Sequence, residues 1–200
     1  MMSKAIIVIE GYLASGKSTY ARLLSKTLSI PYIVKDTFKI ALCESVQITT
    51  REEGSRFSAV TFDAMMYVAE RLMETGYPII IEGNFVPPGM KKVNEAGVIE
   101  SLVKKYSYQS LTYKFTGDTR VLYGRYIERE KSPERGDANR DFEEIPFEHF
   151  DRYCHNLDSF SVGGKVIKVD TSNFCKVDFE QYIEMARQFT TNEAWQRSVI

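Results

Sequence analysis

GYLASGKST, residues 11–19, is the stretch that decides the fold of this chain. It follows the apolar run AIIVIE, residues 5–10, and leads into a segment with helical spacing. Its glycines let the backbone turn tightly, so that successive N–H groups point inward at the positive end of the following helix. Such a nest of amides binds phosphate oxygens. The GxxxxGK[ST] pattern in this strand-to-helix setting therefore predicts a phosphate-binding loop.

The side chains of this motif have distinct predicted roles. Lys17 brings a mobile positive charge to the β and γ phosphates of a nucleotide, and the Ser18 hydroxyl is suited to bind Mg²⁺. The residues expected to bind the nucleotide are Gly11, Ala14, Ser15, Gly16, Lys17, Ser18 and Thr19. The alternative is a chance glycine-rich turn, which composition alone would produce on the order of once per hundred chains of this size. Because the neighbouring strand and helix make that alternative rarer still, we favour phosphate binding.

Strands and helices are predicted to alternate along the sequence. Five short runs, nearly continuous in Ile, Val, Tyr and Phe, are typical of buried strands. These runs are residues 5–9, 32–34, 78–81, 111–115 and 165–169. Segments with helical spacing lie between and after them, at residues 17–28, 37–44, 57–75, 94–105, 119–129 and 178–189. This order predicts an α/β fold with a parallel sheet that is covered on both faces.

Two long polar stretches interrupt this pattern, at residues 49–58 and 129–146. Segments of this kind often serve as substrate loops or lids, and plain solvated loops are the alternative. We expect loops in both places, and we expect the second loop to act as a short lid.

Two acidic residues stand at the ends of predicted strands. Glu82 follows the run PIII, where a carboxylate can hold Mg²⁺ through its water shell, and a solvated strand end is the alternative. Asp36 follows the second run, where it can cap a helix or accept the proton of a hydroxyl that attacks the γ phosphate. The two interpretations of Asp36 are compatible, and the sequence favours neither.

Two arginines follow the fourth predicted strand. Arg125 and Arg129 are four residues apart and therefore share one helix face. Arginines next to a closing lid can stabilise the charge that develops during phosphoryl transfer. The alternative is a surface helix, in which neighbouring glutamates neutralise them. Because the phosphate-binding motif is present, we treat both as candidate catalytic residues.

The composition excludes several classes of protein. The chain has 200 residues, of which 44% are apolar and 26% charged, as expected for one globular domain spanning residues 1–200. A net charge of -1 provides no broad attraction to nucleic acid or to an anionic membrane. The three cysteines are far apart and show no zinc-binding spacing. No apolar run approaches the roughly 20 residues of a membrane span. We therefore expect a cytoplasmic protein without a membrane partner.

Taken in order, the motifs resemble those of the small P-loop kinases of the adenylate-kinase-like type. The segments that carry the resemblance are GYLASGKST, KDTFK, IIIEGNF, RVLYGRYIERE and VIKVDTS, and together they span about residues 5–172. More narrowly, the sequence is similar to the branch with chloramphenicol phosphotransferase, zeta toxin and the kinase domain of polynucleotide kinase. The resemblance implies a three-layer α/β/α fold with a five-stranded parallel sheet in the order 2-3-1-4-5. It also implies ATP and Mg²⁺ as cofactors.

Carried onto this sequence, the resemblance implies a role for each matching residue. Lys17 and Ser18 would hold the triphosphate and the metal, and Asp36 would be the base. Arg125 and Arg129 match the lid arginines. In the third strand, many members have an aspartate where this chain has a glutamate, which makes direct metal ligation there less secure.

Three functions fit these motifs. The first is a kinase that moves the γ-phosphoryl group of ATP to a hydroxyl of a small-molecule or nucleotide-like acceptor. The second is a regulatory NTPase whose partners sense the triphosphate, but the fourth strand is not followed by an NKxD-like guanine-reading motif. The third is a nucleic-acid kinase, and the nearly balanced charge argues against long polymers as partners. We predict an ATP-dependent kinase with an unidentified hydroxyl acceptor.

Overall fold

The computed structural model describes residues 3–43, 46, 48, 50–85, 94–132 and 145–191. A five-stranded parallel sheet crosses the molecule in the order β2-β3-β1-β4-β5. The strands are β1 (Ala5–Gly11), β2 (Tyr32–Val34), β3 (Ile79–Glu82), β4 (Gln109–Thr116) and β5 (Lys165–Asp170). The predicted α/β class and strand order are therefore confirmed.

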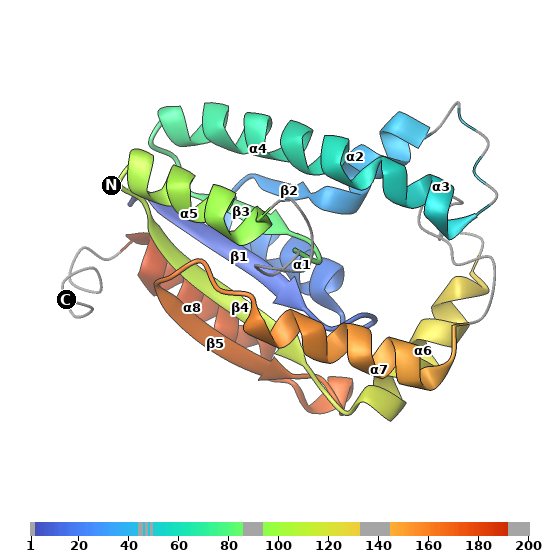
Figure 1. The fold of residues 1–200 in the computed structure, drawn as a ribbon. Helices are drawn as coiled ribbons and strands as arrows, with labels where there is room; N and C mark the ends of the chain where they lie inside the picture. The colour runs from blue at the N-terminus through green and yellow to red at the C-terminus, as the bar shows by residue number, and fades with distance from the viewer. Residues whose placement is uncertain are drawn as a thin grey trace.

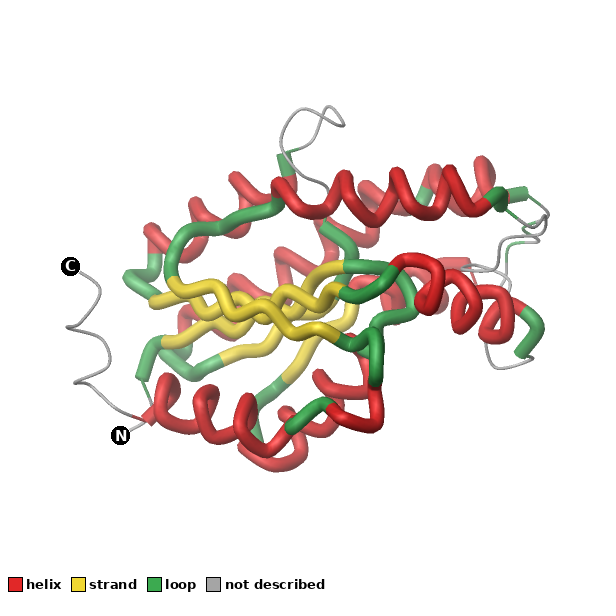
Figure 2. Tube along the Cα trace, turned by 90° about the horizontal axis from the view of Figure 1, so that it is seen from below, coloured by secondary structure: helices red, strands yellow, loops and turns green. Residues whose placement is uncertain are grey.

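Helices cover both faces of this sheet (Figure 1; Figure 2). One face packs against α1 (Lys17–Leu28) and α8 (Phe179–Thr191). The other packs against α2 (Lys35–Cys43), α4 (Ser58–Glu74) and α5 (Glu95–Lys105). The result is the predicted three-layer arrangement. Among the described helices, none has the length and apolar composition that a bilayer crossing requires.

The burial of the central strand β1 explains why its sequence is almost continuously apolar rather than alternating. Every residue of the strand is buried. Side chains on a strand alternate between the two faces of a sheet. Ile7 and Ile9 join the core beneath α1 and α8, whereas Ile6 and Val8 join the core beneath α4 and α5. A strand buried on both faces favours apolar residues along nearly its whole length, and Glu10 is the exception in β1.

A third, smaller core joins the phosphate-binding loop to two further helices, α6 (Thr119–Glu130) and α7 (Phe147–Asn156). Tyr12 of the loop packs there with buried residues that include Leu122 of α6 and Phe150 of α7. Two short 3-10 turns, η3 (Leu157–Ser159) and η4 (Phe174–Lys176), flank β5.

One helix lies where the sequence predicted a polar loop. Within residues 49–58, the structure contains the short helix α3 (Arg51–Arg56). The Thr50 hydroxyl accepts a hydrogen bond from the backbone N–H of Glu53, whose carboxylate accepts one from the backbone N–H of Thr50. This reciprocal capping box is visible in the sequence as T-x-x-E. The prediction of an irregular loop there was wrong because charge was given more weight than this signal.

The second polar stretch is followed by α7, which the sequence prediction did not include. Phe150 and Cys154 are buried, four residues apart on one face of this helix. The remaining residues of α7 are mostly polar, which hid the short amphipathic pattern. The predicted lid at residues 129–146 begins in the last turn of α6, and residues 133–144 lie outside the described residues.

Position 11, at the end of β1, requires glycine, and this requirement can be tested. Its φ is 127°, and a Cβ added there would overlap the backbone carbonyl of Phe115 on β4. Gly11→Ala is therefore expected to lower the free energy of unfolding by roughly 2–4 kcal/mol through strain and overpacking. The measurement is urea-induced unfolding.

Gly124 provides the matched control, because nothing lies within 4 Å of a Cβ added at this position in α6. Gly124→Ala is expected to raise the free energy of unfolding by up to about 1 kcal/mol, since alanine favours a helix. Equal effects of the two substitutions would contradict the role assigned to Gly11.

Candidate active site

The predicted phosphate-binding loop, residues 11–19, leads from the end of β1 into α1. Ala14 and Gly16 both have left-handed backbones, with φ values of 55° and 88°. The Ser15 hydroxyl donates a hydrogen bond to the backbone carbonyl of Tyr12 at 2.7 Å, which closes the turn from inside. Gly16 is the N-cap of α1, and within the described part of the chain no side chain caps this helix end. The N-terminus of α1 is therefore left open for an anion.

Lys17 is folded over this loop. It is buried, and its Nζ donates hydrogen bonds to the backbone carbonyls of Gly11 at 3.0 Å and Tyr12 at 2.6 Å. An ammonium group has three N–H donors, so one remains for a ligand. Burial lowers the pKa of Lys17, and the nearby carboxylates of Glu82 and Glu10 oppose that shift. A bound phosphate would stabilise the charged form of Lys17 in place of the water that burial removes.

Glu82 and Ser18 meet next to Lys17. The Ser18 hydroxyl donates a hydrogen bond to Glu82 Oε2 at 3.1 Å. Glu82 is only 4% exposed, and burial raises its pKa to about 7, although the charge of Lys17 acts in the opposite direction.

The oxygen atoms of this pair are the kind of ligand that Mg²⁺ prefers. Within the described part of the chain, no three metal-ligating side chains come together. A hydroxyl and a carboxylate alone fit Mg²⁺, which keeps several waters and takes other ligands from phosphate. Ser18 and Glu82 are therefore suited to hold such an ion.

Asp36 lies in the first turn of α2. Its side chain is exposed, and its charge acts on both Lys17 and Glu82. Among the described residues, nothing donates a hydrogen bond to its carboxylate. α2 begins at Lys35, so Asp36 lies inside the first turn and does not precede the helix as a cap would. An open carboxylate near the lysine is suited to accept a proton.

The two predicted arginines, Arg125 and Arg129, lie in different surroundings. Arg129 lies close enough for its charge to act on both Lys17 and Glu82. Arg125 instead donates hydrogen bonds to the backbone carbonyls of Thr171 at 2.7 Å and Ser172 at 3.0 Å. The structure thus brings Arg129 near Lys17 and Glu82, whereas Arg125 anchors the loop after β5.

That loop touches the phosphate-binding loop through Phe174. A Cβ at Gly16 would overlap the Phe174 ring, and the Arg125 guanidinium lies 6.0 Å from the centre of the same ring. Phe174 could not be predicted from the sequence, because one aromatic residue after a strand forms no motif.

A buried carboxylate directly before the loop was also missed. Glu10 is fully buried, and its Oε1 lies 3.4 Å from Nζ of Lys114 on β4. Lys114 in turn donates hydrogen bonds to the backbone carbonyls of Asp158 at 2.7 Å and Phe160 at 2.9 Å. Burial raises the pKa of Glu10 to about 7, and Lys114 acts against that shift. The signal in the sequence was a lone charge within the apolar run AIIVIE.

Glu10 should make stability depend on pH near neutrality. Its pKa is higher in the folded chain than the ordinary value of 4.5, so the folded state holds this proton more tightly. The free energy of unfolding should therefore fall as pH rises from 4.5 to about 7, by on the order of 3 kcal/mol from this group. Glu10→Gln removes this contribution. Urea unfolding at pH 5 and pH 8 measures the effect, and parallel pH curves for the two proteins would contradict it.

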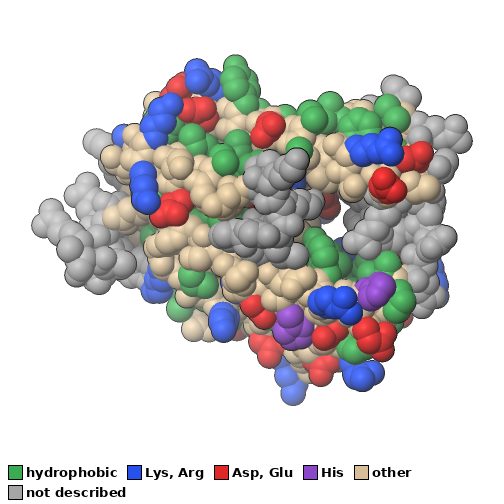
Figure 3. Space-filling view, in the orientation of Figure 1, with side chains coloured by type: hydrophobic (Ala, Val, Ile, Leu, Met, Phe, Trp, Pro, Cys, Tyr) green, Lys and Arg blue, Asp and Glu red, His purple; other side chains and the backbone are tan. Residues whose placement is uncertain are grey.

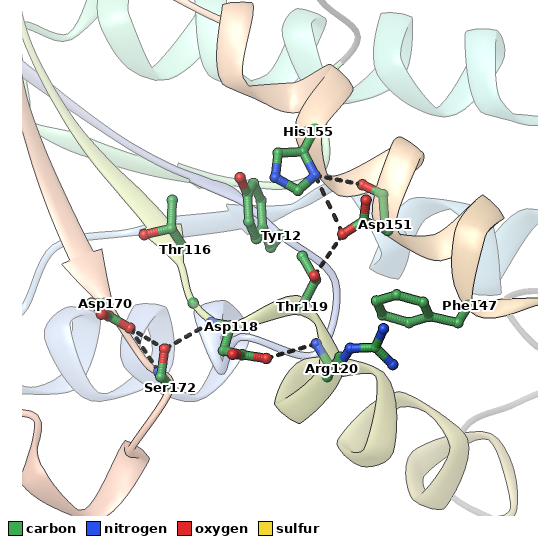
Figure 4. A pocket seen from close by; sticks show the side chains of 11 residues that line it. Tyr12, Thr116, Asp118, Thr119, Arg120, Phe147, Asp151, His155, Asp170 and Ser172 are labelled. Atoms are coloured by element: carbon green, nitrogen blue, oxygen red, sulfur yellow. Dashed lines mark hydrogen bonds and ion pairs between the residues drawn. The ribbon is translucent and has the colours of Figure 1, made fainter.

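A pocket of about 600 Å³ lies beside the site, between α6, α7 and the ends of β4 and β5 (Figure 4). Asp151 accepts a hydrogen bond from the Thr119 hydroxyl at 2.6 Å, and its backbone carbonyl lies 2.9 Å from Nδ1 of His155. The Arg120 guanidinium stacks 4.6 Å from the centre of the Phe147 ring. The contacts of Thr119 with Asp151 and of Arg120 with Phe147 thus join α6 to α7. Figure 3 shows an opening between the side of the molecule that carries α4 and the side that carries α7.

Comparisons with known proteins bear on the fold. No protein-family model matches the chain, and no curated protein matches it. A candidate kinase from Chloroflexus aurantiacus J-10-fl superimposes with a TM-score of 0.82 at 21% identity, covering 94% of this chain and 100% of that chain. A gluconokinase from Sinorhizobium meliloti 1021 gives a TM-score of 0.54 at 13% identity, covering 98% and 99% of the two chains.

A shikimate kinase from Bacteroides thetaiotaomicron also gives a TM-score of 0.54, at 12% identity, covering 94% of this chain and 98% of that chain. The solved neighbours named here are thus kinases or candidate kinases of small molecules or of unstated substrates. The chain has the P-loop kinase fold.

Proposed function

We propose that this protein is an ATP-dependent kinase that transfers the γ-phosphoryl group to a hydroxyl of a small molecule. The observation that carries the proposal is the group formed by Lys17, Ser18, Glu82, Asp36 and Arg129. Lys17, Glu82 and Ser18 are linked by charge or by a hydrogen bond, and Asp36 and Arg129 act electrostatically on the same centre. Two cations, a pair of metal-binding oxygens and an open carboxylate are the parts that phosphoryl transfer requires.

Each residue has a role in the proposed reaction. Bound ATP and Mg²⁺ would supply the phosphoryl group and neutralise its charge. Lys17 and Arg129 bind the negative charge of the transferred group. Ser18 and Glu82 hold the ion, and Asp36 accepts the proton that the acceptor hydroxyl loses. Arg125 keeps the loop after β5 in place.

The class of acceptor is supported by the solved neighbours, among which are a gluconokinase and a shikimate kinase, both named for small hydroxylated acids. The branch with chloramphenicol phosphotransferase and zeta toxin supplies further acceptors to test. The second candidate function is a regulatory NTPase without a small-molecule acceptor, because a phosphate-binding loop alone fits both.

A transfer assay distinguishes these functions. The protein is incubated with Mg²⁺ and γ-labelled ATP in the presence of separate pools of sugars, sugar acids, nucleosides, antibiotics and oligonucleotide ends. The proposal expects a labelled, acceptor-dependent product in a small-molecule pool. Release of labelled phosphate with no labelled acceptor in any pool would favour the regulatory NTPase instead.

A further inference from the structure

A buried ion pair joins α2 to α5 next to the proposed base. Nζ of Lys35 lies 2.7 Å from each carboxylate oxygen of Glu95. The exposed fractions of the two side chains are 10% and 5%. The same Nζ donates a longer hydrogen bond of 3.4 Å to the backbone carbonyl of Asn84, in the segment that follows β3.

Apolar groups enclose this pair. The Lys35 ammonium lies 5.4 Å from the centre of the Phe62 ring on α4 and 5.8 Å from the centre of the Phe85 ring. A Cβ added at Gly83 would come within 2.9 Å of the Lys35 Cβ, so the backbone after β3 packs directly on this lysine. Lys35 thus connects α2, α4, α5 and the end of β3.

Stability alone is a weak explanation for such a pair. Removing two charges from water costs about as much as their attraction returns, and apolar replacements of both partners are often neutral or stabilising. A buried ion pair can instead define a geometry, because displacing either partner leaves a charge unpaired. The useful question is therefore which groups Lys35 holds in place.

The position of Asp36 depends on a short edge strand. β2 has three residues, and among the described strands it pairs with β3 alone, through Tyr32, Ile33 and Val34. α2 starts directly after it, so Lys35 provides an additional fixed point at the first helical residue. The same side chain binds the backbone two residues beyond Glu82.

We propose that Lys35 is a positioning residue for phosphoryl transfer, whose contacts with Glu95 and Asn84 hold Asp36 in register with Glu82. This inference rests on the proposed kinase function, in which those two carboxylates serve the acceptor and the metal. Asn84 takes part in these contacts through its backbone carbonyl, while its buried Oδ1 accepts no hydrogen bond among the described residues.

The test compares two double variants. Lys35→Met with Glu95→Leu removes both charges of the buried pair at once. The matched control is Lys105→Met with Glu70→Leu, which removes an exposed pair of the same 2.7 Å length between α5 and α4. Glu95→Gln is a milder second variant, in case the first does not fold.

Hydrogen exchange followed by mass spectrometry gives a result that does not require an acceptor. In the Lys35→Met/Glu95→Leu protein, amides of residues 35–43 and 83–85 should exchange at least ten-fold faster than in wild type. Peptides of α1 should be unchanged, and the control variant should match wild type throughout the segments 35–43 and 83–85. Unchanged exchange in those segments would overturn the inference.

Kinetics gives the functional result. The Lys35→Met/Glu95→Leu protein should bind ATP within two-fold of wild type and keep its KM for ATP, while kcat for transfer falls at least ten-fold. In an Asp36→Asn background the same change should cost almost nothing more. Faster exchange with an unchanged kcat would make the pair merely structural. If wild type labels no acceptor, the kinase proposal fails, and the exchange result still decides whether Lys35 holds α2.

Discussion

Lys17→Ala is expected to bind Mg²⁺–ATP about 100-fold more weakly than wild type, because charge-assisted hydrogen bonds to phosphate are worth roughly 1.5–3 kcal/mol. Lys17 is already held over the loop by two carbonyl groups, with one donor left for the ligand. Isothermal titration calorimetry measures the effect. Lys17→Met should lose as much affinity as Lys17→Ala, because it preserves the volume of the side chain and removes only the charge.

The matched control lies on the same helix. Lys26 is exposed in the last turn of α1, away from the phosphate-binding loop. Lys26→Ala removes the same charge from the molecule and should leave the affinity within two-fold of wild type. Equal losses in both variants would show that the overall charge, rather than the loop, attracts the nucleotide.

Asp36→Asn is expected to lower the rate of phosphoryl transfer by about 10²–10⁴-fold, the usual contribution of a general base. ATP affinity should be retained, because Asp36 lies on α2 and only its charge reaches Lys17. The rate is measured with an acceptor identified by the labelled pools, and ATP affinity is measured by calorimetry on the same preparation.

An exposed carboxylate on α4 provides the control for this substitution. Asp63→Asn makes the same chemical change outside the group around Lys17 and should leave transfer unchanged. Transfer at the wild-type rate in the Asp36→Asn protein would remove Asp36 from the mechanism. A loss of ATP affinity as large as the loss of rate would instead assign Asp36 to the nucleotide.

Most of the fold could be predicted because buried segments have apolar sequences that can be recognised. β1 faces a core on both sides, so AIIVIE is almost entirely apolar. All five strands were located to within two residues of their observed ends. α3 and α7 were missed because short helices at the surface bury few residues. The local sign of α3 was its capping box, and the local sign of α7 was the buried pair Phe150 and Cys154.

The site could be predicted only in part, because a motif fixes local geometry and not distant contacts. The loop residues and their order were visible in the sequence. That Arg125 would turn toward Thr171, 46 residues away, depends on how α6 packs against the end of β5. The pairing of Lys35 with Glu95 spans 60 residues and follows no periodic pattern. Such contacts emerge only when the sheet brings its strand ends together.

The contacts of Tyr12 have a consequence for how the nucleotide associates. Its backbone carbonyl accepts hydrogen bonds from Ser15 and Lys17, and its phenol donates to both carboxylate oxygens of Asp158, at 3.0 and 3.1 Å. Tyr12 thereby stabilises the loop and links it to the segment before β5. A pre-organised loop loses little conformational entropy when its ligand arrives, so more of the gross interaction energy is retained as affinity.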